Sequence, residues 1–334
     1  MSTRKLMNKP VDVVDEALEG LELAHPQLLA WNRDPSFIHR ARFARPEKVT
    51  LVSGGGSGHE PLHSCFVGTG MLDAAVPGAV FASPTADQII AATQAVGTEA
   101  GVVHVVKNYT GDVLNFQIAA ETAADEGLRV ECVLVDDDLA SESDIEDGPG
   151  RRGTAAVVAV EKVCGAAAEN GASLDTVVEL GRRVAAGSRT MALALRACTH
   201  PDQDRPSFDL ADNEVEMGVG IHGERGRERV PFGTADELVD SMLPSIIDSL
   251  GLTRGDRVLA ITNGLGATHP LELHITHRAV AAHLARRGIH LARSLVGTYV
   301  TALDMSGCSI TLTRVDDEML TLWDAPVRTP ALTW

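Results

Sequence analysis

The sequence predicts an α/β protein with two α/β domains, and its length, its composition and its order of segments each support that prediction. The chain has 334 residues, which is more than a single hydrophobic core usually supports. Aromatic residues make up only 4% of the chain, so Ala, Val, Gly and Leu supply most of the apolar volume, as in parallel sheets covered by helices. Apolar runs alternate with helical patterns, an order that predicts right-handed connections within a parallel sheet.

Residues 1–187 are predicted to form the first domain. A helix is expected at 11–24, where Val and Leu recur at three- and four-residue spacing. The run KVTLVSGGG, residues 48–56, is typical of a buried strand that ends in a glycine-rich loop, and the apolar run at 102–106 repeats this pattern before another polar turn. A helix, a turn and a further strand follow, and that strand ends at three aspartates, residues 136–138.

Two successive helices complete this domain, over residues 150–171 and 173–187. Ser173 is placed to cap the second helix and Gly187 to end it. The first domain is therefore expected to be a Rossmann-like, parallel-rich sheet with helices on both faces. Loops that follow parallel strands lie together at the carboxyl edge of the sheet, where α/β proteins bind their ligands.

Residues 188–334 are predicted to form a second, smaller α/β domain. A glycine- and charge-rich segment at 207–233 marks the change in composition that separates it from the first domain. The alternation of strands and helices is again typical of an α/β unit. The elements expected after this segment are a helix near 235–250, a strand at 257–262, a helix at 271–286, and strands at 289–296 and 309–315.

Charge and composition argue against several classes of function. A formal net charge of −17 disfavours nucleic-acid binding and docking on anionic lipid. The chain has no apolar run approaching the ~18 residues of a membrane span, and its N-terminal residues lack the apolar core of a signal peptide, so a cytoplasmic location is expected. Five scattered cysteines without a C-x-x-C pair favour buried reduced thiols, and no metal site is predicted.

The segment SGGGSGHEP, residues 53–61, contains four glycines and one histidine, His59. It is not a P-loop, because no Gly-Lys-Ser/Thr follows the glycines, and it lacks the third glycine of the dinucleotide fingerprint. The glycines favour a tight backbone turn that exposes amide groups to a small ligand. A structural turn with an incidental histidine remains the alternative interpretation.

Two further segments carry candidate site residues. VKNYTGD places Lys107 and Asp112 after a strand of the same sheet, and GVGIHGE places His222 between small residues. Two histidines, one aspartate and one lysine on such turns could supply a base, an orienting acid and a nucleophile. A solvated lysine and a helix-capping aspartate are the simpler alternatives for Lys107 and Asp112.

Together these segments resemble the substrate-binding K subunits of dihydroxyacetone kinases. The resemblance extends over nearly the whole chain and rests on many segments in the same order. They are LVSGGGSGHEP, VFASPTADQI, VKNYTGDVLNF, GRRGTA, VCGAAAENG, PSFDLADNEVEMGVGIHGE, NGLGAT, LDMSGCSITL and LWDAPVRTPAL.

The resemblance implies that the ketone of dihydroxyacetone is captured covalently by a histidine as a hemiaminal, before a terminal hydroxyl is phosphorylated. His222 would then be the capturing nucleophile, His59 the general acid/base, and Asp112 the carboxylate that activates the hydroxyl. Gly56, Ser57, Gly58 and Lys107 would bind the substrate together with these three residues. In this interpretation the glycines surround a three-carbon ketose rather than a phosphate.

The family also implies partners. It predicts a homodimer without a nucleotide or other cofactor of its own. The chain stops straight after the K-like ending, so the helical nucleotide-binding domain of single-chain kinases is expected on a separate protein. ATP or ADP with magnesium would be carried by a separate L subunit, and in phosphotransferase-linked systems an M subunit would rephosphorylate that ADP. The sequence does not decide between these two phosphate sources.

Two departures from the family pattern and two alternative functions stay open. Arg225 follows HGE where proline is common, and residues 269–274 read HPLELH where the family commonly has Pro-Leu-x-Glu-Leu-Tyr after NGLGAT. The alternatives are a kinase subunit for another small sugar, such as the ketose erythrulose, and a non-catalytic paralogue that senses dihydroxyacetone for a transcription regulator. The presence of His59, Asp112 and His222 together favours the kinase subunit over the sensor.

Overall fold

The computed structural model describes residues 4–42, 45–142 and 150–334. These residues form two compact units. The first unit comprises residues 6–42, 45–135, 157–185 and 321–334, and the second comprises residues 4–5, 136–142, 150–156 and 186–320. The predicted boundary between residues 187 and 188 stays a prediction, and one passage of the chain between the units lies between Ala185 and Ala186.

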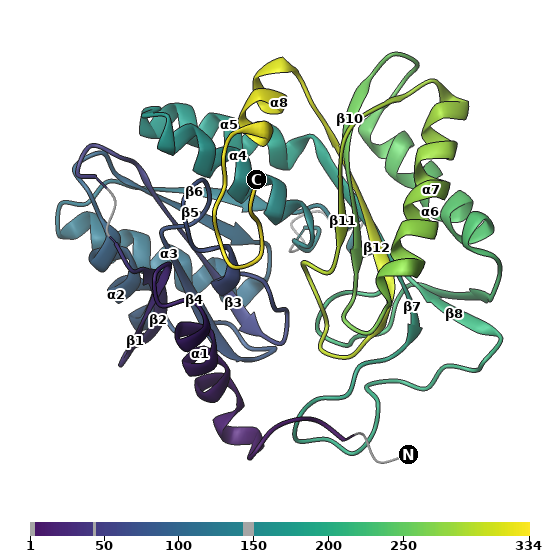
Figure 1. The fold of residues 1–334 in the computed structure, drawn as a ribbon, viewed down its shortest axis with the longest axis horizontal. Helices are drawn as coiled ribbons and strands as arrows, with labels where there is room; N and C mark the ends of the chain where they lie inside the picture. The colour runs from purple at the N-terminus through teal and green to yellow at the C-terminus, as the bar shows by residue number, and fades with distance from the viewer. Residues whose placement is uncertain (1–3, 43–44, 143–149) are drawn as a thin grey trace. The chain divides into compact units, whose positions relative to one another are not determined.

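The first unit is built on a six-stranded sheet with the strand order β1-β2-β4-β3-β5-β6 (Figure 1). Its strands are β1 (Leu29–Arg33), β2 (Ser36–Arg40), β3 (Thr50–Ser57), β4 (Ala74–Val80), β5 (Val102–Lys107) and β6 (Val130–Val135). β4, β3, β5 and β6 are parallel, whereas β1 and β2 form an antiparallel edge. The expectation of a parallel-rich sheet is confirmed.

From β3 to β6 a helix follows each strand, as the predicted alternation requires, while η1 and α1 precede the sheet and α4 and α5 follow one another. They are η1 (Pro10–Asp12), α1 (Val13–Ala24), η2 (Ser64–Phe66), α2 (Ala86–Val96), α3 (Thr110–Asp125), α4 (Ala156–Glu169) and α5 (Leu174–Ala186). The Ser173 hydroxyl accepts a hydrogen bond from the Thr176 amide at 3.3 Å, so Ser173 caps α5 as its position predicts. The helix expected from residue 150 begins instead at Ala156.

Alternate residues of β5 point to opposite faces of the sheet, and both faces are covered. Val102 and Val106 belong to a core cluster with Ile89 and Ala92 of α2 and with Phe116 and Ala119 of α3. Lys107 points to the other face, where it reaches His63, a neighbour of Glu161 on α4. β5 is therefore buried on both sides, which is why its run is almost wholly apolar.

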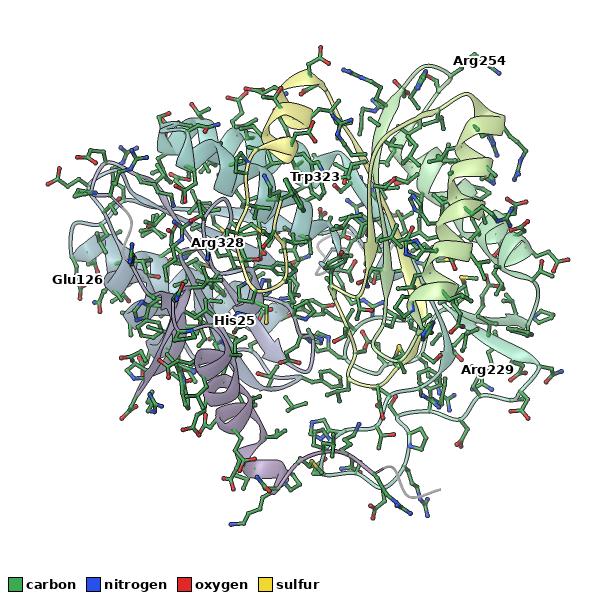
Figure 2. All side chains as sticks on the ribbon, viewed as in Figure 1. His25, Glu126, Arg229, Arg254, Trp323 and Arg328 are labelled. Carbon is green, nitrogen blue, oxygen red and sulfur yellow. The ribbon has the colours of Figure 1, made fainter. Side chains whose placement is uncertain are left out.

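The end of the chain completes the first unit. The Lys162 ammonium of α4 donates to the Leu322 carbonyl at 2.7 Å, and the Arg328 amide donates to the Thr69 carbonyl at 2.9 Å. A Cβ on Gly68 would overlap the Arg328 carbonyl, so glycine permits this close approach. Figure 2 labels Trp323 and Arg328 in this segment, and the Trp323 ring lies against that of Trp334.

The second unit contains another six-stranded sheet, with the order β11-β10-β12-β7-β8-β9. Its strands are β7 (Ser188–Arg196), β8 (Glu214–Met217), β9 (Glu228–Pro231), β10 (Arg257–Gly264), β11 (His290–Gly297) and β12 (Ser306–Arg314). Its helices are η3 (Leu139–Ser141), α6 (Ala235–Leu250) and α7 (Pro270–Arg287), while α8 (Asp317–Asp324) passes from this unit into the first. Among these described strands β10 and β11 pair in parallel, and the other neighbours pair antiparallel.

The core of the second unit lies between this sheet and its two long helices. Met242 and Ile246 of α6 and Val280 and Leu284 of α7 pack with inward-facing strand residues such as Ile310. The predicted elements near 235–250, 257–262 and 271–286 correspond to α6, β10 and α7. Both units are thus of the α/β class that the sequence predicts. Among the described residues, no helix is both long and apolar enough to cross a bilayer.

Candidate active site

The glycines of β3 make room for a buried lysine and for a neighbouring loop. A Cβ on Gly55 would overlap the Lys107 Nζ atom, and a Cβ on Gly56 would lie 2.7 Å from the Ala82 amide nitrogen. Both approaches are far closer than normal contact, so a larger residue at either position would displace its neighbour. Part of the glycine-rich pattern therefore serves close packing within the protein rather than exposure of amide groups.

Lys107 ends β5 and is only 1% exposed. Its Nζ atom lies 2.8 Å from His63 Nε2, 3.2 Å from the Gly54 carbonyl oxygen and 3.8 Å from Asp112 Oδ2. Burial lowers the pKa of Lys107, while the charges of Asp112 and Glu161 act in the opposite direction. The alternative of a solvated loop charge does not fit this environment.

Asp112 lies in the first turn of α3 and is 3% exposed. The N-cap residue of this helix is Tyr109, which makes no side-chain capping bond, so Asp112 is not the cap. Within the described part of the chain, Asp112 Oδ1 has no hydrogen-bond partner. A buried carboxylate oxygen without a partner carries an energetic cost, which a ligand hydroxyl placed there would remove.

His59 and its neighbours form a compact turn after β3. The buried His59 ring stacks on Phe81, with 5.2 Å between the ring centroids. The Gly58 amide donates to the Glu60 carboxylate at 3.0 Å, and Gly58 has the positive φ of 97° that favours glycine. The Ser57 hydroxyl donates to the Gly78 carbonyl at 2.7 Å. The Ser57 hydroxyl and the Gly58 amide thus both have partners within the protein.

His63 and Glu161 extend this cluster, and sequence reasoning did not select either of them. His63 Nδ1 lies 2.5 Å from Glu161 Oε1, and both side chains are buried. Burial lowers the pKa of His63 well below its usual value, and burial raises the pKa of Glu161 to about 8. A Glu-Lys pair inside the apolar run AAVVAVEKVCGAAA was the available signal, because a charge is rarely placed there without a partner.

His222 lies in the loop between β8 and β9 of the second unit. Its backbone amide donates to Glu224 Oε2 at 2.8 Å, and Glu224 Oε1 lies 2.5 Å from Arg152 Nη1. Arg152 also binds Asp138, whose pKa is raised to about 6 by burial against the opposing effect of Arg152. Gly223 has a φ of 78°, as the loop requires. The backbone at His222 is therefore fixed by a chain of charged side chains.

The predicted site residues thus divide between the units. The first unit holds Gly56, Ser57, Gly58, His59, Lys107 and Asp112, whereas His222 belongs to the second. Their catalytic and binding roles remain predictions. Among the described residues, no group of three His, Cys, Asp or Glu side chains could hold a metal ion.

The fold and this buried polar cluster define an α/β protein whose candidate site lies where the parallel strands of its first sheet end. Residues 19–331 match the family model described as the Dak1 domain. The chain belongs to the Dak1 domain family.

Three known proteins illustrate this relationship. The dihydroxyacetone-binding subunit of the PEP-dependent dihydroxyacetone kinase from Escherichia coli is 45% identical, over 99% of both chains. The solved structure of a dihydroxyacetone kinase operon co-activator superposes with a TM-score of 0.89 at 30% identity, covering 95% of this chain and 97% of that one. The solved dihydroxyacetone kinase of C. freundii has a TM-score of 0.88 at 35% identity, covering 99% of this chain but 60% of its own.

Proposed function

We propose that this chain is the substrate-binding subunit of a dihydroxyacetone kinase and takes part in converting dihydroxyacetone to its phosphate. The observation that carries the proposal is the buried pair of Asp112 and Lys107, in which Asp112 Oδ1 has no partner among the described residues. A neutral polyol can supply hydroxyl groups to both side chains without bringing a further charge into the site. Full-length similarity to a dihydroxyacetone-binding kinase subunit supports this choice of substrate.

The proposed chemistry begins with capture. An imidazole nitrogen of His222 attacks the ketone carbon, a C–N bond forms, and the carbonyl oxygen takes up a proton while the imidazole loses one. The product is a neutral hemiaminal with the same atoms as its two reactants. Glycerol has no carbonyl group, so this step excludes it by chemistry where hydroxyl contacts alone would discriminate poorly.

The phosphorylation step uses the first unit. Asp112 accepts the proton of a terminal hydroxyl as that oxygen attacks a phosphorus atom, and His59 acts as general acid and base at the captured carbon. Lys107, with Gly56, Ser57 and Gly58, would hold the substrate oxygens. The phosphoryl group would come from ATP, or from ADP rephosphorylated by an M subunit, on a separate L subunit with magnesium. We further propose that the protein acts as a homodimer.

Intact-mass spectrometry under native conditions, without a reductant, tests the capture. The wild-type chain should gain the mass of one triose when incubated with dihydroxyacetone, and no mass when incubated with glycerol. The His222→Ala variant should show no adduct. The His290→Ala variant, changed at an exposed histidine of the same unit, is the matched control and should react like the wild type. An adduct that persists in His222→Ala would overturn the assignment.

A second candidate function is supported by the similarity to an operon co-activator. A sensor of dihydroxyacetone could share the capture step but would not need Asp112 and His59 for phosphoryl transfer. Turnover with an L subunit and ATP decides between the two. A panel that also includes erythrulose and glyceraldehyde identifies the preferred substrate in the same experiment.

A further inference from the structure

A buried chain of hydrogen bonds runs behind the proposed catalytic pair, entirely within the first unit. It begins at Lys107 Nζ, passes through the two ring nitrogens of His63 and ends at the Glu161 carboxylate. The three side chains come from β5, from the loop after β3 and from α4. They are 1%, 5% and 0% exposed, so none of them exchanges protons freely with water.

The geometry of the His63 ring links the charges at the two ends of this chain. When Lys107 is an ammonium group it can only donate, so His63 Nε2 must accept and the ring proton must sit on Nδ1. The Nδ1–H group then donates to Glu161 Oε1, which is a stronger acceptor when it is ionised. A charged Lys107 therefore favours a charged Glu161.

Ser53 lies beside the same ring nitrogen. Its oxygen is 3.0 Å from His63 Nδ1, and its hydroxyl donates to the Val105 carbonyl at 2.7 Å. With its proton on that carbonyl, Ser53 accepts from Nδ1–H, as the charged form of the hydrogen-bond network requires. A Ser53 hydroxyl turned to Glu161 instead lowers the pKa of that carboxyl.

The uncharged form has the same number of protons. Lys107 gives one proton to His63 Nε2 while His63 Nδ1 gives its proton to Glu161 Oε1, which leaves a neutral amine, the opposite histidine tautomer and a carboxylic acid. Glu161 Oε2 has no hydrogen-bond partner in the described structure, which disfavours a full negative charge there. Burial moves the pKa of Lys107 down and that of Glu161 up to about 8, so the two groups approach each other in proton affinity.

We propose that His63 and Glu161 are positioning residues that set the charge of Lys107 beside Asp112, with the His63 tautomer as the link. Of the three hydrogen-bonded side chains, Lys107 is the one that pairs with Asp112. Glu161 therefore acts on the proposed reaction through Lys107. In the charged form Lys107 presents an ammonium group to Asp112 and to a substrate oxygen. This inference rests on the proposed function for its kinetic consequence but not for the coupling itself.

Other titratable groups lie around the hydrogen bonds that join Lys107, His63 and Glu161. Asp112 faces Lys107 from α3, and His59 lies near enough to His63 for its charge to lower the pKa of His63. On α4, the Glu161 charge acts on the Cys164 thiol. The ring nitrogens of His63 bond to Lys107, Glu161 and Ser53, so the coupling runs through the first two of these contacts.

Nuclear magnetic resonance on the wild-type chain tests the coupling without any variant. With ¹⁵N-labelled histidine, the His63 signals at neutral pH should show a neutral ring with Nδ1 protonated, or fast exchange between both tautomers. With ¹³C-labelled lysine, the Lys107 Cε signal should report an ammonium group when His63 is protonated at Nδ1 and move toward a neutral amine to the extent that the Nε2-protonated tautomer is populated. A His63 ring fixed with Nε2 protonated while Lys107 remains charged would refute the inference.

The Glu161→Gln variant tests the consequence. Gln keeps the shape but removes the buried anion, so the deprotonation midpoint of Lys107 should fall by at least about one pH unit. With an L subunit and ATP, the alkaline limb of the pH profile of kcat/KM should then shift by the same interval to lower pH than in the wild type, with activity recovering toward acid pH. The control Glu179→Gln, an exposed site on α5, should leave both unchanged.

The outcomes separate cleanly. A loss of activity that is the same at every pH would assign Glu161 a purely structural role and overturn the inference. If Glu161→Gln shifts the deprotonation midpoint of Lys107 but the wild-type protein phosphorylates no substrate, the coupling is supported and the proposed function is contradicted. If Glu161→Gln fails to fold, the wild-type histidine tautomer still decides.

Discussion

The Asp112 carboxylate is buried, and it lies 3.8 Å from the amine of Lys107, which is buried as well. Within the described residues, one carboxylate oxygen of Asp112 (Oδ1) and one of Glu161 (Oε2) have no hydrogen-bond partner. Such incompletely bonded buried groups are costly and occur mostly where a ligand or a reaction uses them. This arrangement supports the proposal that the cluster serves chemistry.

The Asp112→Asn substitution should separate capture from turnover. Asn keeps nearly the same shape but cannot accept the hydroxyl proton, and general acid–base assistance contributes about 10²–10⁴-fold. Turnover with an L subunit and ATP should fall on that scale, while the triose adduct on His222 should largely survive. The His59→Asn substitution should behave in the same way. Asp125→Asn, at the exposed end of α3, is the control, and normal turnover by Asp112→Asn would contradict the assignment.

His104 should make the free energy of unfolding depend on acid pH. Its Nε2 atom lies 2.8 Å from the Thr93 hydroxyl, and burial lowers the pKa of His104 to about 3. The unfolded chain takes up this proton near pH 6.5 but the folded chain does not, so stability falls as pH drops from about 6.5 to 3. The slope should reach up to ~1.4 kcal/mol per pH unit.

Denaturant unfolding at pH 7, 5 and 4 measures this effect. The His104→Gln variant should lose the His104 part of the slope, whereas His290→Gln, changed at an exposed site, should keep it. Equal slopes in the wild type and His104→Gln would show that His104 titrates normally in the folded protein.

The departure from the family pattern at residues 269–274 has a structural role at the start of helix α7. His269 is the N-cap of α7, where its Nδ1 atom accepts a hydrogen bond from the Leu271 amide at 3.2 Å. Glu272 reaches back to the His269 amide at 3.2 Å, and Pro270 occupies the first turn. The segment HPLE therefore forms a capping box with an imidazole in place of the usual hydroxyl.

The His269→Ala substitution should cost about 1 kcal/mol of unfolding free energy, because the Leu271 amide loses its partner. His269→Ser should restore most of it, since a hydroxyl can accept the same bond. Thermal denaturation measures the difference, with His274→Ala on the exposed face of α7 as the control. A His269→Ala variant as stable as the wild type would mean that solvent replaces the cap at no cost.

The parts of the molecule that local patterns describe could be predicted, and the parts made by distant contacts could not. The alternation of apolar runs predicts β3, β5 and their helices, and the glycine-rich turns lead to His59 and His222. The contact between His63 and Glu161 joins residues far apart in the sequence, which no local period reveals. The antiparallel pairings of the second sheet could not be predicted either, because β10 and β12 are buried along nearly their whole length, a pattern that parallel strands usually show.

At the scale of the whole molecule, we expect the purified chain alone not to phosphorylate dihydroxyacetone with ATP and magnesium. The sequence has no P-loop that would bind the phosphates of a nucleotide. A coupled assay for dihydroxyacetone phosphate should show turnover only after an L subunit is added. Robust turnover without it would place a nucleotide site on this chain and contradict the proposed division of labour.

The return of residues 321–334 to the first unit has a consequence for biosynthesis. Lys162 of α4 finds its acceptor on Leu322, and the loop at Thr69 pairs with Arg328, so this unit cannot finish packing while the ribosome is still translating the second. Until those residues are made, the Lys162 ammonium and the Thr69 carbonyl lack the partners that they have in the folded unit.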